Sequence, residues 1–260
     1  IVLHTHMEDP VPVIAFGTKK FTRPVLLYNH ASHLLRLGGS IADLVLDLEK
    51  NDEITSLKRG EKNTFFLGVP SKEIVYSKPD KKALRKKLNL PFDKKIIISS
   101  GSEQKYNVSL NEIFPEMLEK LINNNTYCFI IGIQKNNKYW KNIEKLSKGH
   151  IRTLGYVSFQ EGYLDYLAAA DLYLDSYPFG GGTAAMDAVS RGTPLLSLKS
   201  ACLQLDFLQE TDAYCETPEE LMQKGYRILS DKNYADKILK QLQNSLEKYQ
   251  SKEAWTKRTN

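Results

Sequence analysis

Three consecutive glycines, Gly180, Gly181 and Gly182, are followed by Thr183 and, four residues later, by Asp187. Because glycine has no side chain, this run lets the backbone turn sharply and approach a ligand closely. A helical pattern begins at Thr183, which is the expected N-cap. The free N–H groups and positive dipole end of such a helix can hold a diphosphate. Asp187, one turn further on, can accept hydrogen bonds from two vicinal hydroxyls of a ribose.

A second interpretation of this segment is a flexible glycine turn ahead of an ordinary helix, whose Asp187 merely favours the helix dipole. The run matches neither the dinucleotide-binding spacing nor the Walker spacing. The residues alone therefore leave both interpretations open.

A polar loop, residues 101–107, follows another apolar run and holds two more candidates. Lys105 can neutralise the charge of a departing phosphate group, and its alternative is an ordinary surface lysine. Gln104 can meet either a base or a phosphate, and the sequence does not choose between them.

Four of the five histidines precede residue 52, namely His4, His6, His30 and His33. A neutral imidazole can accept the proton of an attacking group, and we favour His30 or His33 for this catalytic role over an ordinary hydrogen-bonded loop position. His-x-His and His-x-x-His spacings also suit a metal, but a stable site needs further ligands. No Asp-x-Asp pair follows a strand, so we predict no catalytic metal.

The candidates depend on a chain in which apolar β-rich runs alternate with helical patterns, which predicts βαβ units and a parallel sheet. Continuous apolar runs such as residues 95–98 favour a sheet that helices cover on both faces. We expect an α/β fold: a doubly wound, Rossmann-like domain over residues 60–228, preceded over residues 1–52 by the last part of another such domain. An amphipathic helix is expected over residues 229–260. The predicted strands of the complete domain are 95–100, 127–133, 150–155, 172–176 and 195–198, and its predicted helices are 81–88, 113–123, 138–147, 162–169 and 183–191.

The composition is that of a globular protein, with 42% hydrophobic and 26% charged residues. The net charge of +5 is concentrated in residues 78–95 and in the last twenty residues, which read as solvated helix faces. No RNA-recognition pattern accompanies them, so we expect no nucleic-acid partner.

The sequence also bears on location. No apolar run approaches the length of a membrane span and no basic-then-apolar leader opens the chain, which leaves peripheral membrane association open. The three cysteines are too few and too dispersed for a disulfide framework, and we expect a cytoplasmic protein.

The stretch from Ala168 to Ser200 resembles the donor site of GT-B glycosyltransferases. Residues 170–175, 182–187 and 192–196 carry the likeness, which extends weakly over residues 20–200. It is closest to the O-linked N-acetylglucosamine transferases and the bacterial cytoplasmic N-glycosyltransferases. The resemblance implies a two-domain enzyme of which this chain holds the C-terminal, donor-binding domain and part of the domain before it.

The resemblance also implies roles for individual residues. The backbone from Gly181 through Gly182 and Thr183 to Ala184 would hold the diphosphate, with Asp187 on the ribose. Where the family can carry a histidine ahead of the threonine, this chain has Gly182, so a side-chain contact to phosphate is lost. A second group of residues would complete the site, with Lys105 on the departing phosphates and the backbone of Tyr156 and Val157 on the uracil edge.

By this resemblance the activity is transfer of a hexose or N-acetylhexosamine from a UDP-sugar to a protein or glycan, with no cofactor besides the donor. Retaining enzymes commonly carry a carboxylate shortly before the ribose acid, and residues 176–186 hold none, which favours inversion. Two alternatives stay open: a nucleotide-sugar epimerase of the same build and a non-catalytic binding module. We expect weak donor binding and little or no transfer by these 260 residues alone.

Overall fold

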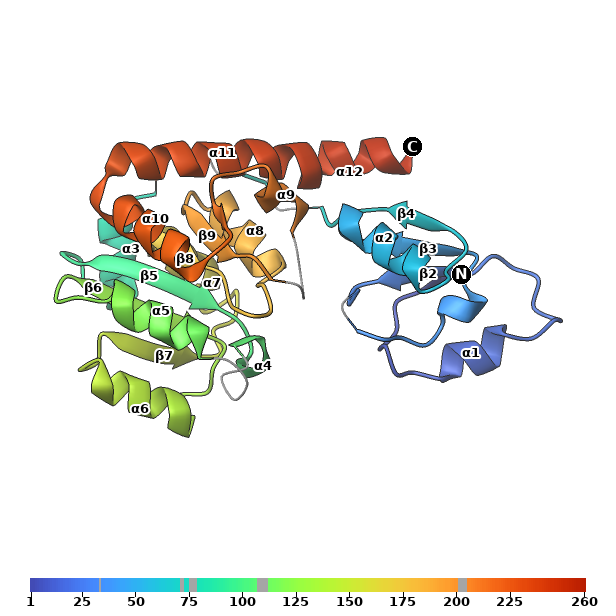
Figure 1. Cartoon of the computed structure of the whole chain (residues 1–260), viewed down its shortest axis with the longest axis horizontal. Helices are drawn as coiled ribbons and strands as arrows, with labels where there is room; N and C mark the ends of the chain where they lie inside the picture. The colour runs from blue at the N-terminus through green and yellow to red at the C-terminus, as the bar shows by residue number, and fades with distance from the viewer. Residues whose placement is uncertain (33, 71–72, 75–78, 107–111, 201–204) are drawn as a thin grey trace. The chain divides into compact units, whose positions relative to one another are not determined.

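The computed structural model describes residues 1–32, 34–70, 73–74, 79–106, 112–200 and 205–260. Its elements are shown in Figure 1. The chain divides into two compact units: unit 1, made of Ile1–Pro70 and Tyr249–Asn260, and unit 2, made of Ser71–Lys248. These limits differ from the expected divisions near residues 52, 60 and 228 because a fourth strand and the end of the chain pack within unit 1.

Unit 2 is built on a six-stranded sheet in the order β10-β9-β8-β5-β6-β7. Every pairing in this sheet is parallel, which confirms the predicted α/β doubly wound fold. The first strand in sequence, β5, lies at the centre, and the chain continues outward from it first to one side and then to the other. The strands are β5 (Lys95–Ser100), β6 (Thr126–Ile131), β7 (Ile151–Gly155), β8 (Leu172–Leu174), β9 (Leu195–Leu198) and β10 (Tyr214–Cys215).

Helices cover both faces of this sheet, as its continuous apolar strands predict. Ile96, Ile97 and Ile98 of β5 are completely buried, although successive side chains point to opposite faces. Burial of one such side chain contributes about 1.5–3 kcal/mol. The helices of unit 2 are α3 (Lys81–Lys87), α4 (Glu103–Tyr106), α5 (Ile113–Leu121), α6 (Lys138–Leu146), α7 (Tyr163–Ala169), α8 (Thr183–Ser190), α9 (Asp206–Gln209) and α10 (Pro218–Ser230).

The C-terminal segment contains more than the single predicted amphipathic helix. After α10 come α11 (Lys232–Gln250) and α12 (Lys252–Thr259). The expected apolar stripe on α11 is buried, since Ile238, Leu242 and Leu246 have no exposed area. Ser251 ends the pattern because its hydroxyl caps α12 by accepting a hydrogen bond from the Ala254 amide at 3.0 Å.

Unit 1 has a four-stranded parallel sheet in the order β1-β2-β3-β4 with a small core of Leu3, Val25, Leu27 and Val45. The last residues of the chain belong to it because Arg258 donates to the Leu67 carbonyl at 3.1 Å. The elements are β1 (Val2–Leu3), α1 (Val11–Phe16), β2 (Leu26–Asn29), the 3-10 helix η1 (Gly39–Ile41), β3 (Leu44–Asp47), α2 (Lys50–Lys58) and β4 (Thr64–Phe66). In the part of the chain that the structure describes, no helix is long and apolar enough to cross a membrane.

Candidate functional site

The loops that follow β5 and β8 lie side by side at the carboxyl edge of the unit 2 sheet, because these two strands pair directly. The chain leaves them in opposite directions, so this is the topological switch point at which open parallel sheets bind ligands. The first loop carries Gly101 and Lys105, and the second carries Asp175 and the glycine run. The sequence candidates on these two loops are therefore brought together.

Lys105, on the short helix α4, joins the two loops. Its ammonium donates a hydrogen bond to the Gly180 carbonyl at 2.8 Å, and its own carbonyl accepts one from the Phe179 amide at 3.1 Å. Burial lowers the pKa of Lys105, and the nearby Asp175 carboxylate opposes that shift. A partly desolvated ammonium is thus fixed beside the glycine loop, where an anion would interact with it more strongly than in water.

Asp175, which sequence reasoning assigned no role, is the residue that shapes the glycine loop. Its Oδ1 accepts hydrogen bonds from the Gly181 amide at 2.7 Å and the Ser176 amide at 3.0 Å, and its Oδ2 accepts from the Ser197 hydroxyl at 3.0 Å. Burial raises the pKa of Asp175, while the three donors and Lys105 oppose the rise. The available signal was a carboxylate between a buried strand and a glycine run.

Gly181 has to be a glycine because of this close approach. A Cβ at that position would lie 2.7 Å from Asp175 Oδ1 and 3.0 Å from the Tyr173 hydroxyl. Both groups are buried, so neither can move away without disturbing the sheet edge. The loop conformation therefore depends on a backbone that touches a carboxylate directly.

The start of α8 corrects one prediction about this loop. Gly182 is the N-cap, with φ 58° and ψ −118°, and Thr183 is the first helical residue with an exposed side chain. Gly182 has no side chain to satisfy the first amides of the helix. No described residue accepts a hydrogen bond from the Gly182 or Thr183 amide, whereas Ala184 donates to the Gly181 carbonyl at 3.2 Å. Two amides at the positive end of a helix thus face the switch point.

Comparisons with known proteins agree with this geometry. The family model described as Glycosyl transferases group 1 matches residues 80–258. The chain belongs to this family. Its Rossmann-like fold is that of GT-B glycosyltransferases, and no curated protein sequence matches it.

Several solved glycosyltransferase structures resemble the chain at low sequence identity. Sucrose-phosphate synthase from Thermosynechococcus elongatus has 16% identity and a TM-score of 0.71, over 93% of this chain and 67% of that one. Anabaena HepE in complex with UDP has 14% identity and a TM-score of 0.70, over 91% and 71%. A variant of TarM from S. aureus, in complex with UDP among other ligands, has 12% identity and a TM-score of 0.72, over 96% and 52%. The chain thus spans about half of TarM.

Asp187 of this glycosyltransferase lies in the second turn of α8 and is mostly buried, with 8% of its area exposed. It is within electrostatic reach of Tyr163. Burial and the Asp187 charge together raise the pKa of Tyr163 to about 12, against the effect of a hydrogen bond with Ser100. The Asp187 carboxylate therefore lies close enough to Tyr163 to affect its ionisation, and its contact with a ribose stays a prediction.

The remaining donor-site candidates lie on loops at the same edge. Gln104 is exposed on α4, Tyr156 is 82% exposed after β7, and Val157 is half-buried. Gly132, which follows β6, lies between the loop after β7 and the loop after β5. Its amide donates a hydrogen bond to the Gly155 carbonyl at 2.8 Å, and a Cβ on it would overlap the Gly101 carbonyl oxygen.

The candidate base belongs to unit 1, where His30 follows β2 and is exposed. Its ring centroid lies 5.1 Å from that of His4. His33, the other candidate, lies outside the described residues. Next to His30 in the sequence, Asn29 donates to the fully buried Asp47 at 2.5 Å, and burial raises the pKa of Asp47 to about 6. In the described ranges, no three His, Cys, Asp or Glu side chains gather in a way that could hold a metal ion.

Proposed function

We propose that this chain is the donor-binding part of a glycosyltransferase that moves a hexose or N-acetylhexosamine from a UDP-sugar to a protein or glycan acceptor. Membership of the Glycosyl transferases group 1 family supports a sugar transferase in general. The UDP-bound state of HepE and TarM supports UDP as the nucleotide. This chain spans 52% of the TarM chain, so the acceptor, the base and the stereochemistry are proposed for the complete enzyme.

One observation carries the proposal: Lys105 and the amides of Gly182 and Thr183 gather at the switch point of the sheet. When the sugar's anomeric carbon is attacked, its bond to the diphosphate oxygen breaks and negative charge grows on the leaving phosphate. An ammonium and two backbone donors held in a partly desolvated site stabilise that charge. The chemistry then needs no bound metal, and the nucleotide-sugar is the only small molecule required.

The attacking group loses a proton during transfer, and we assign the base to His30 or His33. An imidazole is suited to this step because it is largely neutral near pH 7. Direct displacement with inversion is the proposed stereochemistry, since residues 176–186 contain no carboxylate that could act on the other face of the sugar. We further propose kinship with the O-linked N-acetylglucosamine and cytoplasmic N-glycosyltransferases, and a cytoplasmic location.

The decisive experiment is calorimetric titration of the whole chain with UDP, ADP and GDP. We expect UDP to bind most tightly and Lys105→Ala to weaken it by about tenfold or more, since a charge-assisted contact is lost. Lys141→Ala is the matched control, because that lysine pairs with Glu144 on an exposed helix face. Failure of UDP to bind, or equal losses in the two lysine variants, would overturn the proposed donor site.

The ribose and base assignments have tests of their own. Asp187→Ala should weaken the binding of UDP without weakening the binding of inorganic diphosphate. An unchanged UDP affinity would contradict the ribose assignment. For the base, UDP release by the complete enzyme is measured with and without acceptor after His30→Ala and, separately, His33→Ala. Release that continues equally without acceptor would instead favour an epimerase or hydrolase over a transferase.

A further inference from the structure

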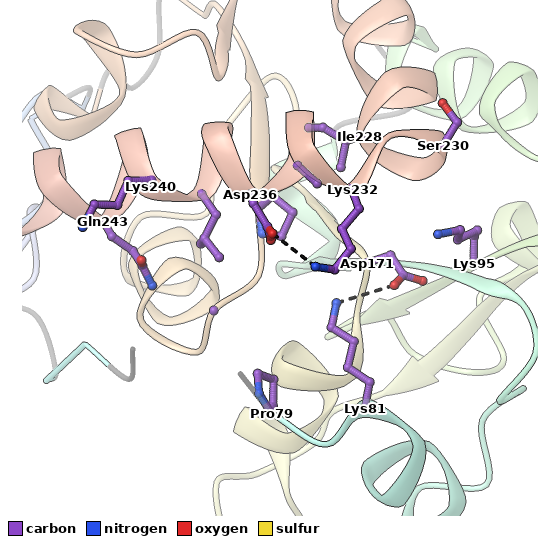
Figure 2. A pocket seen from close by; sticks show the side chains of 14 residues that line it. Pro79, Lys81, Lys95, Asp171, Ile228, Ser230, Lys232, Asp236, Lys240 and Gln243 are labelled. Carbon is purple, nitrogen blue, oxygen red and sulfur yellow. Dashed lines mark hydrogen bonds and ion pairs between the residues drawn. The ribbon is translucent and has the colours of Figure 1, made fainter. Parts of the chain in front are cut away.

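Asp171 and Asp47 carry carboxyl groups in opposite surroundings. Asp171 lines a cavity of about 520 Å³ at the amino edge of the unit 2 sheet, beside α11, as Figure 2 shows. Its partners include two cations, since it pairs with Arg85 at 2.7 Å and lies 3.5 Å from the Lys81 ammonium. Asp47 of unit 1 is fully buried, and both described donors to its carboxyl group are neutral side chains. An ionised carboxylate is less stable in such surroundings than beside a cation.

The donors to Asp47 both reach the same oxygen atom. Asp47 ends β3 and lies in register with Asn29, which ends β2. Its Oδ1 accepts hydrogen bonds from the Asn29 amide at 2.5 Å and from the Ser56 hydroxyl at 3.0 Å. Arg36 acts on Asp47 only through its charge, because its guanidinium is held by Glu61 at 2.6 Å. The other carboxyl oxygen, Oδ2, is therefore the one that decides the state of Asp47.

Two buried acceptor atoms of this pair have no donor. Asn29 Oδ1 and Asp47 Oδ2 both lack a hydrogen-bond partner among the described residues. An ionised carboxylate cannot correct this, because both atoms then only accept. A neutral carboxylic acid can, because its carbonyl oxygen accepts the two bonds that Oδ1 receives and its hydroxyl donates to Asn29 Oδ1. One proton thus accounts for both unpaired atoms.

The electrostatics of the site favour the same proton. Burial is the main cause that raises the pKa of Asp47 to about 6, and the charge of Asp52 on α2 adds to the rise. The hydrogen bonds from Asn29 and Ser56 and the charge of Arg36 act in the opposite direction. Asp47 therefore keeps its proton into mildly acidic solution and loses it near neutral pH.

The same network holds the chain on both sides of the candidate base. Asn29 directly precedes His30 in the sequence. Arg36, on the other side of His30, donates to the Ser56 hydroxyl at 3.3 Å, and Ser56 in turn donates to Asp47. Because these side chains are buried and joined to one another, a change at Asp47 reaches the backbone that carries His30.

We propose that Asp47 and Asn29 are positioning residues for His30 and act as a cyclic acid–amide pair, in which neutral Asp47 donates its proton to Asn29 Oδ1. Loss of the proton leaves a buried negative charge against the Asn29 carbonyl oxygen, which loosens the backbone before His30. The role of His30 as the base rests on the proposed function, whereas the acid–amide pair does not depend on it.

The proton is tested by NMR titration of the whole chain with aspartate labelled at the ¹³C carboxyl carbon. The Asp47 signal should titrate near pH 6 and be absent from Asp47→Asn. Burial also raises the pKa of Asp175, so Asp175→Asn identifies that signal and keeps the assignment possible if the first variant does not fold. An Asp47 carbon that titrates below about pH 4.5 would overturn the acid–amide pair.

Positioning is tested by hydrogen exchange of the His30 and Leu34 amides, which donate to the Tyr28 and Ala31 carbonyls. After correction for intrinsic exchange, their protection in the wild type should fall by about tenfold between pH 5 and pH 7. Asp47→Asn should keep the protection at both pH values, because an amide donates to Asn29 Oδ1 as the neutral acid does.

The matched control is Asp43→Asn. Asp43 lies in the same unit and accepts a hydrogen bond from the Val25 amide at 2.8 Å, so this variant should keep the wild-type pH dependence. Asp47→Val, which has no donor or acceptor, should lose the protection at both pH values. Equal pH dependence in the wild type and Asp47→Asn would overturn the positioning role, as would an equal loss of protection throughout the strands of unit 1.

Failure of the proposed function has a different signature. If His30→Ala leaves UDP release with acceptor unchanged, His30 is not the base. The titration of Asp47 and the protection of the Leu34 amide would still follow the expected course in the wild type, so the two failures are distinguishable.

Discussion

Both edges of the unit 2 sheet bring hydrogen-bond donors together, but the donors come from different parts of the chain. At the carboxyl edge the donors are backbone amides of Gly182 and Thr183, with Lys105 as the one cation that joins the two loops. At the amino edge the donors are side chains that converge on Asp171. Backbone donors are fixed by the fold, whereas side-chain donors can be added or removed one at a time.

This difference sets how each edge responds to substitution. The carboxyl edge depends on the absence of side chains, so adding a single methyl group disturbs it. The amino edge depends on charge balance, so removing a single carboxylate disturbs it. Changes at the amino edge should leave UDP binding at the carboxyl edge intact.

Gly181→Ala should have the largest effect. The new methyl group would overlap Asp175 Oδ1, so we expect a loss of about 2–4 kcal/mol in the free energy of unfolding and at least about a hundredfold weaker UDP binding. Urea denaturation and calorimetry measure the two quantities. In the control Gly182→Ala, no described residue other than its chain neighbours has an atom within 4 Å of the new methyl, and the positive φ opposes it at about 1–2 kcal/mol. Equal stability losses would contradict the role of Asp175.

Asp171→Ala tests the amino edge. The substitution leaves the buried Arg85 without its carboxylate and the Ile96 amide without its acceptor, so we expect a stability loss of about 3 kcal/mol. UDP affinity of the folded protein should change by less than about twofold. The control Asp165→Ala breaks an exposed pair with Lys87 and should lower stability by at most about 1 kcal/mol. A large change in UDP affinity would show that the two edges are coupled.

The pH dependence of UDP binding should sharpen the role of Lys105. Its lowered pKa means that the ammonium loses its proton below the usual value for lysine, so its attraction for a diphosphate is present at neutral pH and fades as pH rises. Between pH 7 and pH 10 we expect the affinity to fall by about tenfold more in the wild type than in Lys105→Arg, which stays charged. The comparison cancels ionisation of the ligand itself. Parallel pH profiles would contradict the assignment.

Tyr156→Ala should have the smallest effect. The predicted contact to the uracil edge uses backbone groups of Tyr156 and Val157, and the ring of Tyr156 is 82% exposed. UDP affinity should therefore change by about two- to threefold at most, as measured by calorimetry. A loss of tenfold or more would mean that the ring stacks on the base, and the backbone interpretation would then be wrong.

Much of the fold could be predicted from the sequence because continuous apolar strands such as Ile96–Ile98 have a strong local signal. The switch-point loops were also predictable, since each follows a strand and carries glycine or lysine. The lengths of the C-terminal helices were not, because Ser251 changes the path of an otherwise continuous pattern.

The features missed in the site have a common physical cause. The hydrogen bonds of Asp175 and the pairing of Lys81 and Arg85 with Asp171 join residues distant in sequence, and only the folded sheet brings them together. The sequence predicted Thr183 as the N-cap, one residue after the actual N-cap, Gly182. The positive φ of Gly182 cannot be predicted from the neighbouring residues. The ribose, base and uracil assignments stay predictions.

The hydrogen bond between Lys105 and the Gly180 carbonyl has a consequence for the thermodynamics of donor binding. A lysine on a mobile surface loses much rotational freedom when it meets a phosphate, and that lost entropy weakens binding. Here the side chain is already restrained, so an arriving diphosphate exchanges one acceptor for a stronger one. Binding should therefore be driven mainly by enthalpy, with the site preorganised before the nucleotide enters.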